Sequence, residues 1–217
     1  MSRRALLFSI VGLLALLGLL AELGQEFFPS PIVRALVGLF SLSYEGNIPN
    51  WYSSCLLFWC GLSLARISAG LWKRHDAFRW HWILLAGGFF YMSLDEAVGI
   101  HENFGGITQV GGLLYYDWIL PASMLILILA LFYWPFLRSL PSKARRDFLF
   151  AAALFLGGAV AMELPLGYWA DRFGVDNFGY AAIDLVEETL ELLGLTVFLL
   201  GLEDHWRRLT AIEGVPR

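Results

Sequence analysis

Acidic side chains occur inside stretches of this sequence that are otherwise apolar, and their spacing indicates a shared site. The segment 93–102, SLDEAVGIHE, ends one apolar run with three carboxyl groups and an imidazole. A later apolar run contains Glu163, and the last one contains Asp184, Glu187, Glu188 and Glu191. Ionisable side chains within apolar runs are costly and usually face a bundle interior, a cavity or a metal ion. The sequence therefore predicts a carboxylate site that includes one histidine.

A bound divalent metal ion is one way to neutralise so many acids at one level. Carboxylates with an imidazole suit hard or borderline ions, so we expect Zn, Fe or Mn. Glu187 is the predicted general base of such a centre. Two alternatives stay open, namely a network of protonated carboxyl groups and acids dispersed over the surface. The predicted metal ligands are Asp95, His101, Glu102, Glu163, Glu188 and Glu191.

Helical geometry decides which of these residues can share a site. At about 100° per residue, the four acids of the last run fall on one helix face within an arc of roughly 100°. Asp95 and Glu102 are nearly eclipsed on a continuous helix, whereas His101 points elsewhere. A site that includes both Asp95 and His101 therefore requires the backbone to bend near Gly99.

Composition places these acids in an integral membrane protein. The chain has 217 residues, of which 58% are hydrophobic and only 16% are charged, whereas about a quarter of the residues of a soluble domain are charged. We predict a single all-α domain over residues 1–217, a polytopic membrane helical bundle. Residues 31–43 are too few to cross a bilayer and indicate a short interfacial or re-entrant helix. The six predicted transmembrane helices cover residues 5–21, 51–71, 80–98, 117–137, 148–169 and 183–202.

The distribution of charge along the chain predicts the orientation. Six spans place both termini on one side, and of the 15 Lys and Arg residues only Arg34 and Arg172 fall on the other side. Lys and Arg are enriched in the cytoplasmic loops of membrane proteins, so both termini are expected in the cytoplasm. Most of the 19 acids lie on or near the outer side, which puts the predicted site at the outer ends of the third, fifth and sixth helices. No basic stripe suggests a nucleic-acid partner.

Three segments also carry a resemblance. The strings YEGNIPNWYSS, FFYMSLDEAVGIHE and LVEETLELLG resemble a family of bacterial multi-pass membrane proteins with no established activity, which implies a location in the bacterial inner membrane. Leu94-Asp95-Glu96 is similar to a motif of the alkaline ceramidase-like membrane hydrolases, which implies that Asp95 is a zinc ligand. Glu187-x-x-x-Glu191 stands where that group has a His-x-x-x-His pattern.

These observations lead to three hypotheses for function. The first is a membrane-embedded, metal-dependent enzyme that acts on a lipid-like substrate taken from the bilayer. The second is a non-catalytic subunit or assembly factor whose acids bind a basic segment of a membrane protein partner. The third is a transporter of protons or cations, in which the same acids act as relay or binding groups.

Overall fold

A computed structural model describes residues 1–72, 74–100, 111–116 and 118–211. All regular structure within these ranges is helical, in agreement with the predicted all-α class. The chain begins with α1 (Arg3–Phe27), the short α2 (Pro31–Phe40) and α3 (Ile48–Trp72). It continues with α4 (Arg79–Val98), a 3-10 turn η2 (Gly112–Leu114), α5 (Ile119–Ser139) and α6 (Ser142–Leu156). The π-helical segment η3 (Gly157–Met162), α7 (Glu163–Phe173) and α8 (Phe178–Ala211) complete the chain.

Local sequence signals explain several helix boundaries. Ser30 begins α2, because its hydroxyl accepts a hydrogen bond from the Val33 amide at 3.2 Å and Pro31 fits the first turn. Asn47 caps α3 in the same way, accepting from the Asn50 amide at 3.1 Å. Gly99 ends α4 in the left-handed region with a φ of 62°, which favours glycine. The backbone therefore bends at Gly99, as a shared site with Asp95 requires.

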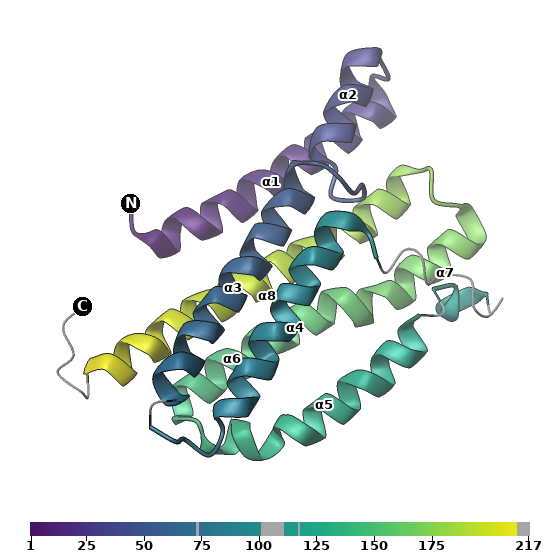
Figure 1. Ribbon diagram of the computed structural model, residues 1–217. Helices are drawn as coiled ribbons and strands as arrows, with labels where there is room; N and C mark the ends of the chain where they lie inside the picture. The colour runs from purple at the N-terminus through teal and green to yellow at the C-terminus, as the bar shows by residue number, and fades with distance from the viewer. Residues whose placement is uncertain (73, 101–110, 117, 212–217) are drawn as a thin grey trace.

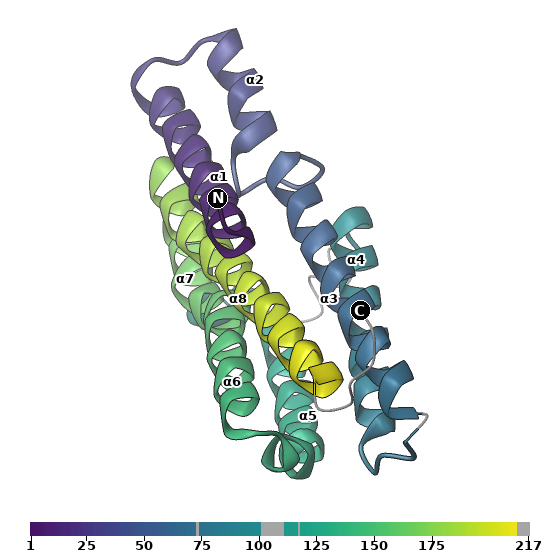
Figure 2. The ribbon, with the colours of Figure 1, turned by 90° about the vertical axis from the view of Figure 1, so that its left-hand side faces the viewer.

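The long helices lie side by side and roughly parallel or antiparallel to one another, with α8 in the middle (Figures 1 and 2). The 34-residue α8 contacts α1, α3, α6, η3 and α7. Its buried leucines pack against the buried face of α3 to form much of the core, as with Leu195 and Leu199 against Cys60 and Leu64. The buried leucines lie on the same side of α8 as its acids, whereas the opposite face is less buried, with Val186 48% exposed.

Four helical segments are long and apolar enough to cross a membrane: Arg3–Phe27, Ile48–Trp72, Ile119–Ser139 and the continuous stretch Ser142–Phe173. The other two predicted spans, 80–98 and 183–202, are also helical but carry acids that lower their hydropathy. The outward surface is strongly apolar. On α5, the side chains of Met124, Leu127 and Leu131 are each more than 60% exposed.

The two ends of the bundle differ in charge. At one end the start of α1 meets the end of α8, where Arg3 pairs with Glu203 and Arg4 lies 2.6 Å from Asp204. Lys143, at the start of α6, adds a 3.2 Å contact to Asp204. The α1–α2 turn, the segment 41–47 and the α7–α8 connection lie at the opposite end (Figure 1).

Candidate functional site

The acids of α8 form a series along its first third, on the face that points into the bundle. Asp184 and Glu187 are 8% and 6% exposed, and Glu188 and Glu191 are partly buried. Spacings of three, four and seven residues keep all four on one side of the helix. None of the four forms an ion pair with a basic side chain in the part of the chain that the structure describes.

Two other helices bring acids to the same place. Glu163 is the first residue of α7. Its carboxyl group is close enough to those of Glu187, Glu188 and Glu191 for their negative charges to repel one another. Glu96 of α4 acts on both Glu188 and Glu191. The structure thus gathers carboxyl groups from α4, α7 and α8, three elements that are far apart in the sequence. We call Glu96, Glu163, Asp184, Glu187, Glu188 and Glu191 the carboxylate cluster.

On α4, the charge of Glu96 acts on this cluster, and the role of its neighbour Asp95 as a metal ligand stays a prediction. Asp95 is partly buried near the end of α4. The Asn50 side-chain amide holds Glu96 by donating to its backbone carbonyl at 2.9 Å and to its Oε1 at 3.0 Å. One residue along a helix rotates a side chain by about 100°, which separates the directions of Asp95 and Glu96. The sequence signal for Asn50 was its place in the polar string YEGNIPN, which leads into the first turn of α3.

The π-helical segment η3 carries Glu163 to the cluster. Pro165 has no amide hydrogen and cannot bond to the carbonyl four residues earlier, which weakens the regular ladder there. The helix departs from α geometry just before Glu163. Gly158 of η3 packs directly against α8, since a Cβ added there would lie 2.6 Å from the Glu187 carbonyl oxygen. Single π-turns of this kind are frequent at functional sites.

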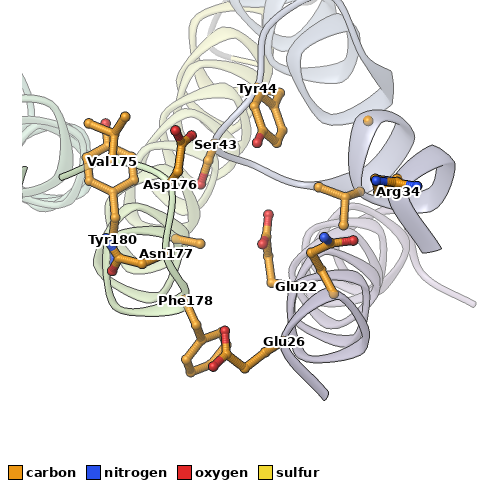
Figure 3. A pocket seen from close by; sticks show the side chains of 14 residues that line it. Glu22, Glu26, Arg34, Ser43, Tyr44, Val175, Asp176, Asn177, Phe178 and Tyr180 are labelled. Atoms are coloured by element: carbon orange, nitrogen blue, oxygen red, sulfur yellow. The ribbon is translucent and has the colours of Figure 1, made fainter. Parts of the chain in front are cut away.

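A cavity of about 700 Å³ lies beside the start of the acid series (Figure 3). Its walls come from the end of α1, from α2, from Ser43 and Tyr44, and from the α7–α8 connection with the first turn of α8. Ser43 also forms a side-chain hydrogen bond with Asp184. The negative charge of Glu22 is close enough to repel that of Asp184. The cavity wall is therefore adjacent to the outermost acid of the series.

A pair of phenols lies near the same acids. The Tyr116 and Tyr180 hydroxyls are 2.7 Å apart and share a hydrogen bond. Burial is the main cause that raises the pKa of Tyr116 to about 12, with smaller contributions from the charges of Glu163 and Asp184. Both phenols thus keep their protons at neutral pH and can donate to an acid or to a bound ligand.

Two cluster oxygens, Asp184 Oδ2 and Glu187 Oε2, are buried without a hydrogen-bond partner among the described residues. A buried carboxylate oxygen with no donor is unfavourable unless a proton or another positive charge neutralises it. The cluster as a whole has the same requirement, because its like charges repel one another at short range. Its chemistry is that of a site that takes up positive charge.

The predicted metal centre gains no support from the described residues. Among them, no group of three or more His, Cys, Asp or Glu side chains is arranged to hold a metal ion. The structure brings Glu163, Glu187, Glu188 and Glu191 together, and Asp95 lies at the adjacent end of α4. His101 and Glu102 lie outside the described residues. The metal-ligand roles and the role of Glu187 as general base stay predictions.

The family model of a domain of unknown function, DUF8692, matches residues 5–206 of the chain. The match covers nearly the whole chain, so the protein belongs to this family. Comparisons with curated proteins and with solved structures give no match.

Proposed function

We propose that this member of the DUF8692 family is a six-span membrane protein that takes up protons or cations from the outer side into its carboxylate cluster. Four segments with the length and apolarity of transmembrane helices support the membrane location. The exposed leucines of α5 would be unfavourable in water and are suited to lipid. In this proposal α4 and α8 are the remaining two spans, buried enough by their neighbours to tolerate their acids.

The orientation follows from charge. The end of the bundle that holds both termini also carries most of the basic residues, among them Arg3, Arg4 and Lys143. We place that end in the cytoplasm of a bacterial cell. The cavity and the start of the acid series then face the outer side. Positive charge would arrive from outside, first at Asp184 and then deeper along α8.

The observation that carries the proposal is the buried acid series on one face of α8. Glu191 lies eight residues beyond Ile183, where the predicted span starts, which is about 12 Å along the helix. That distance is close to half of a hydrocarbon core about 30 Å thick. Carriers commonly bind their ions near this depth, next to helices interrupted by Gly or Pro. The α6–η3–α7 unit, with Gly158 and Pro165, is an interrupted helix of this type.

In this proposal, positive charge reaches the cluster from one side only. Between Glu191 and the ion pairs of Glu203, α8 is lined by apolar neighbours such as Leu64 and Ile67 of α3. Release to the cytoplasm would require a second conformation, and we propose that η3 is the hinge, because its hydrogen-bond ladder is already irregular. The alternative is a site that binds positive charge without transferring it.

Proton flux into liposomes tests the proposal. Vesicles that contain the purified protein and an internal pH-sensitive dye are given an inward proton gradient. We expect uptake that Glu191→Gln reduces by roughly tenfold or more, because the amide cannot exchange a proton. Asp171→Asn, the same kind of change at an exposed acid outside the cavity lining, should retain uptake. Equal flux in the native protein, the Glu191 variant and empty vesicles would rule out proton transfer.

Elemental analysis of the detergent-purified protein separates this proposal from the metal-dependent enzyme. One or two equivalents of Zn, Fe or Mn, lost in a Glu188→Ala/Glu191→Ala variant, would identify the positive charge as a metal ion. The search would then turn to lipid-like substrates. Co-purification of a membrane protein partner that depends on the same two residues would instead favour the subunit or assembly factor.

A further inference from the structure

The cavity beside the acid series has the size and lining of a ligand site. Its volume of about 700 Å³ falls within the range of roughly 300–1,000 Å³ that is typical of small-molecule pockets. It is built from segments that meet only in the folded chain, namely the end of α1, α2, residues 43–44 and the α7–α8 connection. Figure 3 shows Glu22, Ser43, Tyr44 and Asp176 around its centre.

Acidic groups dominate the charge around this cavity. Three carboxyl groups line it, those of Glu22, Glu26 and Asp176, against one guanidinium, that of Arg34. No ion pair joins these four residues to one another in the described part of the chain. Burial raises the pKa of the Tyr44 phenol, and the charges of Glu22 and Asp176 raise it further. The field inside the cavity therefore favours a positively charged ligand.

Aromatic rings add a second preference. Tyr44, Phe178 and Tyr180 are part of the lining, and aromatic faces attract ammonium groups. A carboxylate beside an aromatic ring suits an alkylammonium ion better than a strongly hydrated metal ion, because the ring replaces water poorly around a hard ion. The side-chain oxygen of Gln25, which has no hydrogen-bond partner among the described residues, can accept a hydrogen bond from an amine that carries hydrogens.

The position of the cavity points to the membrane surface. The short helix α2 exposes Ile32, Leu36 and Leu39 on its outside, as expected of a helix that lies in the interface. Arg34 projects from the same helix and lines the cavity. A phosphate group bound to Arg34 would leave an attached amine within reach of the three acids.

We propose that the cavity binds the ammonium group of an organic amine, and that in the membrane this amine is an aminophospholipid headgroup whose phosphate meets Arg34. This inference rests on the proposed function for its placement at the outer membrane surface, and it names the organic cation received there. A soluble amine shares the ammonium chemistry but does not use Arg34. The two sources can therefore be told apart.

Calorimetric titration of the detergent-purified full chain tests the inference with three probes. These are ethanolamine, dihexanoyl phosphatidylethanolamine and, as an amine-free control, dihexanoyl phosphatidylglycerol. Both amines should bind and the control should not. The Glu22→Gln/Asp176→Asn variant should weaken amine binding roughly tenfold. Arg34→Gln should weaken only the aminophospholipid, and an equal effect on ethanolamine would overturn the headgroup assignment.

Two results would overturn the amine site altogether. One is binding of the phosphatidylglycerol control as strong as that of the amines, and the other is absence of amine binding to the native protein. Glu191→Gln separates this inference from the proposed function, since that residue is remote from the cavity lining. Amine binding that persists in this variant, without any proton flux in the native protein, would refute the transport proposal alone. Proton flux without amine binding would refute the inference alone.

Discussion

The two ends of α8 hold acids in opposite surroundings. Near its C-terminus, Glu203 and Asp204 pair with Arg3, Arg4 and Lys143 and join α1, α6 and α8. Near its N-terminus, Asp184, Glu187, Glu188 and Glu191 lie inside the bundle without a described basic partner. The first set holds helices together. The second set opposes packing by mutual repulsion of its carboxyl groups.

The largest expected effect comes from the close contact that holds the cluster together. In Gly158→Ala, the new Cβ would meet the Glu187 carbonyl oxygen at 2.6 Å. Backbone cannot yield as a flexible side chain does, so we expect a loss of about 1–3 kcal/mol in the free energy of unfolding. Unfolding by SDS in mixed micelles measures it.

Gly157→Ala is the matched control for this change. Nothing lies within 4 Å of a Cβ at Gly157, so alanine should leave stability unchanged or raise it by up to about 1 kcal/mol. Equal losses in the two variants would mean that the η3–α8 contact is not what supports the cluster.

The second prediction compares the stability effects of removing one acid of the carboxylate cluster, Glu187, and one ion-paired acid, Glu203. Glu187→Met removes the buried Oε2 that lacks a partner and keeps a similar volume. We expect it to stabilise the protein by about 1–3 kcal/mol, while proton uptake falls. Glu203→Gln breaks an ion pair at a partly exposed surface and should destabilise by about 1 kcal/mol or less. The same unfolding assay checks both signs, and destabilisation by Glu187→Met would contradict the contrast between the two ends.

The smallest expected effect is the acid sensitivity of the ion-paired end. Burial alone would raise the pKa of Asp204, but the hydrogen bonds and charges of Arg4 and Lys143 outweigh it and lower the pKa below 3.8. A carboxyl group whose pKa is lower in the folded state stabilises at pH values above its unfolded pKa. That contribution is lost as the pH falls through the folded pKa.

Thermal unfolding of the native protein and of Asp204→Asn tests this pH dependence. The native protein should unfold at a higher temperature at pH 6, by an amount that corresponds to less than about 1 kcal/mol. The difference should shrink as the pH is lowered past 3.8. A difference that stays constant down to pH 3 would show that Asp204 does not act through these charges.

Much of this arrangement was accessible from the sequence. Helical periodicity predicted that the four α8 acids share a face, and Gly99 marked the bend at the end of α4. Asn47 and Ser30 are cap residues recognisable by type. These features depend on local helix geometry, which the spacing of residues along the chain determines.

The remaining features depend on tertiary packing. The position of Glu96 depends on the hydrogen bonds that it accepts from Asn50 of α3. The central position of α8 follows from its contacts with α1, α3, α6, η3 and α7, which the sequence of α8 alone does not show. The cavity joins residues more than 150 positions apart, such as Glu22 and Phe178, and no local pattern links them.

The contact between α1 and α8 has a consequence for biogenesis. The ribosome delivers α1 before α8, so Arg3 and Arg4 reach the membrane surface long before Glu203 and Asp204 exist. Until α8 has been translated, the helices that precede it have neither the central helix nor its acids to assemble around. Closure of the bundle is therefore a late, long-range step. A ribosome stalled before α8 would leave an open set of helices exposed to membrane chaperones and proteases.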